Sequence, residues 1–230
     1  MGLGNWQGDP ASGYLFNLAV NLLAQQIKRS EMMKGINNAS REIRISQYAD
    51  DTTLFLKNSP ECLEGALQEL NSFSELSGLR LNVGKSSCMQ IGTPVEQSNE
   101  HHRGIREVDS MKILGIAFTN NNKNITKINL EPKTSQLEKE VAQWRRRNIS
   151  PIGRITVMKS LLISKLVHIF TSLPNPSKEE LKHLENILHK CIWASKRDPI
   201  KRSKIIQNYS HGGLRMLDLL SFVEYENFMA

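Results

Sequence analysis

The chain is short of cysteine, and it has no long hydrophobic run. Its three cysteines, Cys62, Cys88 and Cys191, are odd in number and widely spaced, which excludes the disulfide framework of a small secreted domain. No apolar run approaches the roughly 18 residues of a membrane span, and no signal-peptide pattern begins the chain. We therefore expect an intracellular protein, in the nucleus or cytoplasm, with no membrane partner. A glycine-rich phosphate loop and a cysteine pair at zinc spacing are missing as well.

The net charge of +7 is concentrated in one part of the chain. Residues 1–132 carry a net charge of −1, residues 133–215 of +11 and residues 216–230 of −3. Such basic clusters attract a phosphate backbone, and the affinity gained in this way falls steeply with added salt. The alternative is a solvated basic face without a partner. The candidate nucleic-acid backbone contacts are Arg145, Arg146, Arg147, Lys196, Arg197, Lys201 and Arg202.

Two adjacent carboxylates, Asp50 and Asp51, stand where a strand should turn. Residues 43–46 alternate apolar and polar side chains, and residues 52–56 are rich in strand formers, so the pattern predicts a β-hairpin with the aspartates at its tip. A rigid hairpin suits a divalent cation such as Mg2+, because hard cations take oxygen ligands. The alternative is that aspartate is simply a common turn residue.

The first half of the chain mixes the two periodicities and predicts an α+β fold. A helix over residues 10–29 would have Asp9 as its cap, and a helix over 60–77 would begin after Ser59 and end at Gly78. Strands over residues 79–83, 87–91 and 112–118 would complete an antiparallel sheet. Residues 92–104 read as a surface loop, and residues 119–124 as a turn or linker.

The second half is expected to be helical over residues 135–147, 151–171 and 178–193. Ser177 and Glu180 have the spacing of a capping box for the last of these helices. Trp144 and Trp193 continue apolar helical stripes, so we expect both to lie in the core rather than to stack on bases.

Several short blocks resemble, in their order and spacing, the reverse transcriptase of non-LTR (LINE-type) retrotransposons. The blocks are Gln7-Gly8-Asp9-Pro10-Ala11-Ser12, Tyr48-Ala49-Asp50-Asp51, Gly78-Leu79-Arg80-Leu81-Asn82 with Lys85, Ile113-Leu114-Gly115-Ile116, Pro151-Ile152-Gly153-Arg154, Cys191-Ile192-Trp193 and Gly212-Gly213-Leu214. The resemblance implies a partial polymerase palm over residues 1–120, followed by an all-helical, basic thumb-like region over residues 121–230.

The resemblance also implies an RNA template, a DNA primer and deoxynucleoside triphosphates as partners, and Mg2+, or Mn2+ in its place, as cofactor. Asp50 and Asp51 would hold the metal, and Lys85 would protonate the pyrophosphate that leaves. Gln7, Gly8 and Tyr48 would lie along the incoming nucleotide and template. Leu114 and Gly115 would grip the primer end.

Two departures and one absence restrict this expectation. Trp6 stands where the family usually has arginine, and Gly13 where it usually has proline. A further metal-binding aspartate would come from a strand before Gln7, for which six residues leave no room, so we expect little or no polymerase activity from this chain alone. Three hypotheses stay open: a reverse-transcriptase domain fragment, a non-catalytic nucleic-acid-binding remnant that uses the basic half, and a partner-binding module with exposed apolar strand surface.

Overall fold

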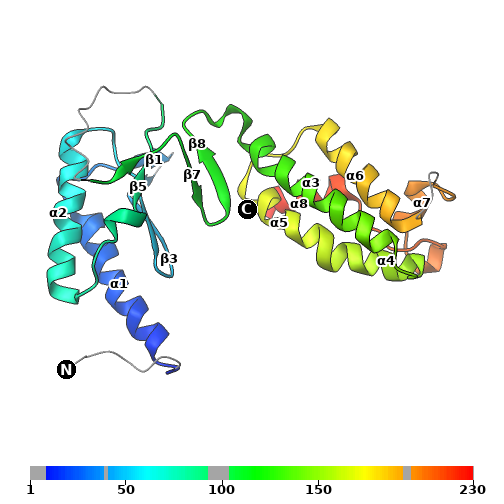
Figure 1. The fold of residues 1–230 in the computed structure, drawn as a ribbon, viewed down its shortest axis with the longest axis horizontal. Helices are drawn as coiled ribbons and strands as arrows, with labels where there is room; N and C mark the ends of the chain where they lie inside the picture. Colours follow the sequence, from blue (N-terminus) through cyan, green and yellow to red (C-terminus); the bar gives the residue numbers. More distant parts are fainter. Residues whose placement is uncertain (1–8, 39–40, 93–103, 194–197, 230) are drawn as a thin grey trace. The chain divides into compact units, whose positions relative to one another are not determined.

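The computed structural model of the chain describes residues 9–38, 41–92, 104–193 and 198–229. The chain divides into two compact units, Met1–Asp109 and Ser110–Ala230, whose α-helices and some of whose strands are labelled in Figure 1. The division between palm and thumb at residues 120 and 121 stays a prediction. The compact units separate earlier in the chain, because the hairpin at residues 110–119 packs with the helices that follow it.

The first unit is built on two helices and several short strands. Its elements are α1 Ser12–Arg29, β1 Ile36–Asn38, β2 Arg41–Ile43, β3 Ile45–Tyr48, β4 Asp51–Leu54, α2 Pro60–Ser77, η1 Val83–Lys85, β5 Ser87–Cys88 and β6 Arg106–Glu107. Helix α1 packs against α2. The small core of this unit consists of Leu23, Ile27, Met33, Ala66 and Phe73.

Helix α2 confirms the expected start and end. The Ser59 hydroxyl accepts a hydrogen bond from the Cys62 amide, and Gly78 ends the helix in the left-handed conformation at φ +74°. Helix α1 begins at Ser12 rather than at residue 10. The expected cap at Asp9 is wrong: the residue before the helix is Ala11, which makes no side-chain cap hydrogen bond. The Asp9 carboxylate instead accepts a hydrogen bond of 2.9 Å from the Ala11 amide, in the turn before the helix.

The expected single antiparallel sheet is wrong for the described residues, which form four separate two-stranded pairs. One of them, between β5 and β6, is parallel. Residues 79–82 form no strand, because the carbonyl and side chain of Asn82 both accept from the Lys85 amide and bend the chain into the η1 turn. The expected strand at residues 112–118 is instead parts of a hairpin, since Leu114 and Gly115 turn the chain at positive φ. Most of the expected loop at residues 92–104 lies outside the described residues.

The second unit is mainly helical. Its elements are β7 Ser110–Ile113, β8 Ile116–Thr119, η3 Asn122–Asn124, α3 Ile125–Arg145, α4 Pro151–Val157, η4 Met158–Ile163, α5 Ser164–Ser172, α6 Lys178–Trp193, α7 Arg202–Ile206, η5 Tyr209–His211 and α8 Leu219–Met229. The predicted turn at residues 119–124 is confirmed by η3. Helix α6 has the expected bounds and capping box: Ser177 and Glu180 bond each other's backbone amides at 2.8 and 3.2 Å.

Helix α3 begins at Ile125, ten residues before its expected start, and contains Pro132. Proline removes one helical hydrogen bond and disfavours a helix interior. Burial of Asn129 and Leu130 against the core stabilises the first turns all the same. The helix also ends two residues earlier than expected, at Arg145.

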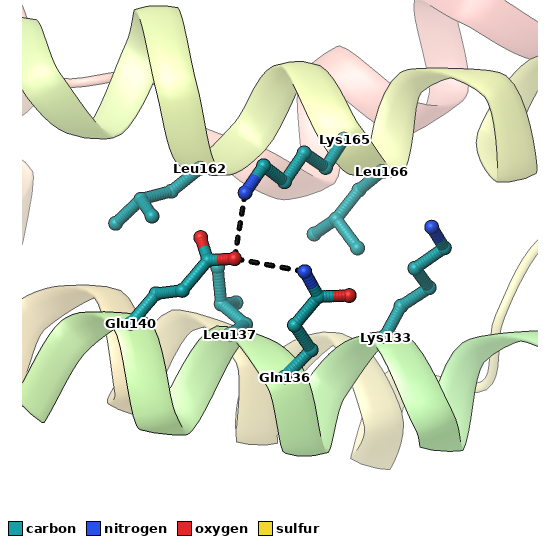
Figure 2. A pocket seen from close by; sticks show the side chains of 7 residues that line it. All are labelled: Lys133, Gln136, Leu137, Glu140, Leu162, Lys165 and Leu166. Atoms are coloured by element: carbon teal, nitrogen blue, oxygen red, sulfur yellow. Dashed lines mark hydrogen bonds and ion pairs between the residues drawn. The ribbon is translucent and has the colours of Figure 1, made fainter.

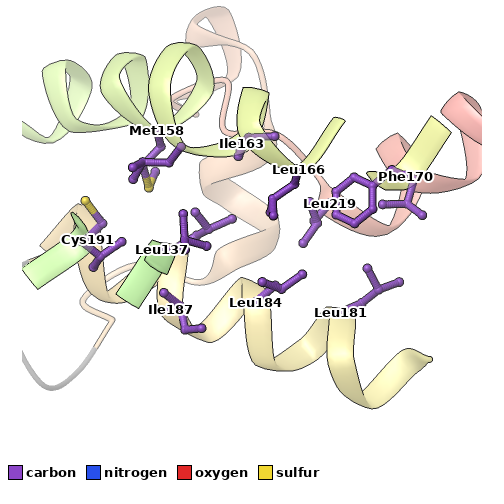
Figure 3. Packing of buried hydrophobic residues seen from close by; sticks show 14 of the residues in the cluster. Leu137, Met158, Ile163, Leu166, Phe170, Leu181, Leu184, Ile187, Cys191 and Leu219 are labelled. Atoms are coloured by element: carbon purple, nitrogen blue, oxygen red, sulfur yellow. The ribbon is translucent and has the colours of Figure 1, made fainter. Parts of the chain in front are cut away.

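Helices α4, η4 and α5 follow one another without interruption, and their buried side chains form the centre of the second core. Figure 3 shows Met158, Ile163, Leu166 and Phe170 from this segment facing residues of α6. By length and hydropathy alone, Pro151–Ser172 is the one helix in the described part that would also suit a membrane span. Its core contacts account for the same apolar composition.

The expected places of the two tryptophans are confirmed. Trp144 and Trp193 are partly buried against the second core. All three cysteines carry free thiols, Cys62 and Cys191 buried and Cys88 half-buried.

Candidate active site and nucleic-acid interface

The predicted aspartate hairpin is confirmed. Strands β3 and β4 pair with Tyr48 opposite Asp51, so that Ala49 and Asp50 form a two-residue turn and Asp51 opens the return strand. Ala49 has φ +52°. This conformation costs an alanine about 1–2 kcal/mol, and such strain clusters at functional sites.

The base of the hairpin is fixed to α1. Ile45, Leu54 and Leu56 pack against the first core. Arg44 precedes β3, and its guanidinium donates to the carbonyls of Ser30 at 2.6 Å and Lys28 at 3.2 Å, where α1 ends. A charged donor at a helix C-terminus satisfies orphan carbonyls and complements the helix dipole. The strands therefore direct the turn outward from a rigid base.

Asp50 and Asp51 are both exposed, and their oxygens fit the ligand preference of Mg2+. The described residues contain no group of three or more histidine, cysteine, aspartate or glutamate side chains that could hold a metal ion. Both carboxylate oxygens of Glu42 already accept hydrogen bonds, from Arg44 at 2.8 Å and from the Gly35 amide at 2.6 Å. These two bonds, the Arg44 bond first, lower the pKa of Glu42. The two aspartates thus suit a metal but supply only part of its shell.

The other predicted residues of this site are spread over the first unit. Tyr48 is 67% exposed on β3. Lys85 is exposed at the end of η1. Gln7 and Gly8 lie outside the described residues.

The second hairpin contains the predicted primer-contacting residues. Leu114 at φ +47° and Gly115 at φ +90° form the turn between β7 and β8. His168 on α5 lies 2.8 Å from the Leu114 carbonyl through Nε2, and Nε2 must donate because a carbonyl only accepts. The Ser172 hydroxyl lies 3.4 Å from the other ring nitrogen. Helix α5 therefore holds the strained turn.

Helix α3 holds the same hairpin through Asn129, whose side chain is buried. Its Oδ1 accepts from the Ala117 amide at 2.7 Å, and its Nδ2 donates to the Ala117 carbonyl at 2.8 Å and to the Ile125 carbonyl at 2.9 Å. The amide thus pairs with β8 as a neighbouring strand would. Sequence reasoning missed both Asn129 and His168, since each lies on a helix far along the chain from its partner.

The predicted basic residues are mostly exposed. Arg146 and Arg147 are exposed, Arg145 is half-buried, and the Arg147 guanidinium lies 4.4 Å from the centre of the Trp144 ring. Lys201 is exposed, whereas Arg202 bonds Asp198 at 2.9 Å. Lys196 and Arg197 lie outside the described residues.

Arg154 joins two of these basic segments from inside the unit. Its guanidinium donates to the carbonyls of Ile149 at 3.0 Å and Arg147 at 3.2 Å, both after α3, and of Cys191 at 3.0 Å near the end of α6. The side chain is buried, yet all its bonds are charge-assisted and well formed. The end of α3 is therefore held beside the end of α6.

One shallow pocket between α3 and α5 is shown in Figure 2. It holds about 190 Å³, counting space open to solvent. Glu140 and Lys165 form an ion pair of 2.6 Å across it, and Gln136 bonds the same carboxylate at 2.9 Å. The pKa of Glu140 is lowered, chiefly by the Lys165 bond. The polar groups of Glu140, Lys165 and Gln136 therefore pair with one another and stabilise the packing of the two helices.

Sequence comparison assigns the family. Residues 3–118 match the model of the family described as reverse transcriptase (RNA-dependent DNA polymerase). The chain belongs to this family, as its motifs suggested, and the match includes both hairpins.

More particularly, the chain is similar to the retrovirus-related Pol polyprotein from the type-2 retrotransposable element R2DM of Drosophila melanogaster. The two are 27% identical over 174 residues, which cover 70% of this chain. The match spans 16% of the length of that relative. The resemblance to a non-LTR retrotransposon reverse transcriptase is thereby confirmed.

Proposed function

We propose that this chain forms the metal-holding and primer-contacting part of an RNA-directed DNA polymerase from a non-LTR retrotransposon. The observation that carries the proposal is the Asp50–Asp51 hairpin, which has a rigid base and an exposed acidic turn inside the segment that matches the family. The family match favours this function over the two non-catalytic hypotheses.

In this proposal the predicted site residues have separate roles. Asp50 and Asp51 would hold Mg2+, or Mn2+ in its place, which would supply the positive charge needed to activate the primer hydroxyl and to neutralise the leaving pyrophosphate. Lys85 donates a proton to the pyrophosphate. Gln7, Gly8 and Tyr48 contact the nucleotide and template. Leu114 and Gly115 contact the primer end, and His168 keeps their turn in shape.

The first unit then corresponds to part of the palm, and the helical basic unit to the thumb. Exposed arginines after α3 and Lys201 near α7 give the thumb a phosphate-binding surface for template and primer. We propose that the chain acts inside the cell, in the nucleus or cytoplasm, because RNA templates and deoxynucleoside triphosphates are found there.

Polymerase activity needs more than the two aspartates. A two-metal site usually includes a carboxylate that bridges the ions, and no third acidic side chain joins the pair within the described residues. We therefore propose that another segment of the polymerase supplies it.

Metal binding and primer extension test the proposal separately. Mn2+ titration, followed by paramagnetic broadening of NMR signals, should broaden residues 48–52 first, and Asp50→Asn with Asp51→Asn should abolish that selectivity. Glu31→Gln is the matched control, because it removes one exposed charge from the same unit. Undiminished broadening in the double variant would refute the proposed metal site.

Primer extension on a poly-rA template with Mg2+ or Mn2+ should give little product with the chain alone. Robust synthesis that disappears in Asp50→Ala would contradict the need for another carboxylate, while supporting the assigned hairpin.

A non-catalytic nucleic-acid-binding role remains the second candidate, because the basic residues are exposed and Arg154 joins their segments. Binding would then weaken with salt and be unchanged in Asp50→Ala, whatever the result of primer extension.

A further inference from the structure

Residues 205–216 close into a compact loop after α7. The Ile205 carbonyl accepts from the amides of Leu214 at 2.9 Å and Met216 at 3.1 Å, and the Gln207 carbonyl accepts from Arg215 at 3.0 Å. Ile205 and Met216 are buried in the core of the helical unit. The base of the loop is therefore rigid.

The loop adopts a conformation that most residues avoid. Arg215 has φ +55° and Gly212 has φ +71°. A Cβ atom at Gly213 would collide with the carbonyl group of Gln207, which explains why glycine stands there. A non-glycine residue keeps a positive φ only where its surroundings hold it in that conformation, and such strain clusters at functional sites.

The strained backbone presents an aromatic–guanidinium pair at the surface. Tyr209 is 53% exposed, and the Arg215 guanidinium lies 5.3 Å from the centre of its ring. The Asn208 side chain accepts from Arg215 Nε at 3.1 Å, so the guanidinium plane is oriented before any ligand arrives. A free side chain loses conformational entropy when it binds a ligand. Because the fold already restricts this pair, part of that entropy is lost before binding.

Two lysines lie on the segment that leads into the loop. The side chain of Lys204 approaches the turn at Gly212, and Lys201 is exposed. The acidic residue on this segment, Asp198, pairs with Arg202 at 2.9 Å.

We propose that Tyr209 and Arg215 form a stacking site for an unpaired base of single-stranded nucleic acid. Every base has a π-face that can stack on an aromatic ring or a guanidinium plane, so such a site tolerates different sequences. Lys204 attracts the adjoining phosphate. The site rests on the proposed nucleic-acid binding of the helical unit, and it adds recognition of bases to attraction of the backbone.

Fluorescence anisotropy with two strands of equal length and charge tests the stacking site. One strand is oligo-dT and the other has the same backbone with abasic positions. The wild-type chain should bind oligo-dT more tightly, by roughly 5- to 150-fold for each stacked base. Tyr209→Ala should abolish this preference, whereas Tyr209→Phe should keep it.

Arg146→Gln is the matched control, because Arg146 is exposed outside the loop; it should weaken binding of both strands equally. Circular dichroism checks that the variants are folded. Equal wild-type affinity for the two strands, or an unchanged preference in folded Tyr209→Ala, overturns the stacking site and leaves the proposed backbone binding intact. Failure to bind either strand at low salt overturns both.

Discussion

Arg154 offers the sharpest test of how the helical unit is held together. The substitution Arg154→Met keeps much of the side chain's length and apolar stem but removes all three hydrogen bonds to the carbonyls of Arg147, Ile149 and Cys191. The bond to Cys191 is buried and the other two are partly buried. Each bond to a charged donor is worth about 1.5–3 kcal/mol, but desolvation of the guanidinium offsets part of the sum.

We expect Arg154→Met to lower the free energy of unfolding by about 3–5 kcal/mol, a large part of the stability of a domain this size. Arg154→Lys should lose less, because an ammonium group keeps the charge but cannot reach three carbonyls in a fixed plane. Urea unfolding measures both, with tryptophan fluorescence as the signal, since Trp144 and Trp193 belong to this unit.

The urea midpoint of Arg154→Met should fall by roughly 2–3 M for a typical dependence on denaturant. Arg146→Met is the matched control, because that arginine is exposed and its loss should leave the free energy of unfolding within about 0.5 kcal/mol of the wild type. A change of less than about 1 kcal/mol in Arg154→Met would refute the role assigned to the buried guanidinium.

Three further predictions concern the same unit. Burial lowers the pKa of His189 below its ordinary value of 6.5, so the unfolded chain binds the proton more tightly and stability should fall as pH drops from about 6.5 to the folded pKa; in His189→Gln, urea midpoints should lose this slope. The lowered pKa of Glu140 stabilises the fold above its ordinary value of 4.5, and this contribution should disappear as pH falls through the folded pKa; Lys165→Met should flatten that dependence below pH 4.5, and an unchanged profile would exclude the ion pair as its cause. His168→Ala should speed amide hydrogen exchange at Gly115 and its neighbours in the turn, whereas His168→Gln, which can still donate, should restore part of the protection; equal exchange in wild type and His168→Ala would contradict the anchoring bond.

Local signals were sufficient to predict several elements of the fold. Ser59 and Gly78 delimit α2 because capping depends on residues within one turn of the helix end. The β3–β4 hairpin could be predicted for a similar reason, since its two strands are neighbours in sequence and each carries its own alternation. The family blocks then indicated which turn carries the residues that we propose to bind metal.

Long-range pairing could not be predicted in the same way. The sequence of a short strand does not specify which other strand it pairs with. The strands of the first half form separate pairs rather than one sheet. Pro132 disfavours a helix interior, yet burial of Asn129 and Leu130 outweighs the backbone hydrogen bond that is lost. The burial of Arg154 could not be predicted, because it depends on carbonyls that lie near the ends of two other helices.

The β3–β4 and β7–β8 hairpins share a strained turn but differ in what maintains it. Ala49 at φ +52° turns the proposed metal-holding hairpin, whose base rests on Ile45, Leu54 and Leu56 in the first core. Leu114 at φ +47° turns the proposed primer-contacting hairpin, which His168 and Asn129 hold from the second core. Because the two cores belong to separate compact units, destabilising one unit should disturb one turn and spare the other. Arg154→Met should therefore raise hydrogen exchange at residues 113–116 while leaving residues 48–52 unchanged, and equal changes at both turns would show that the units unfold together.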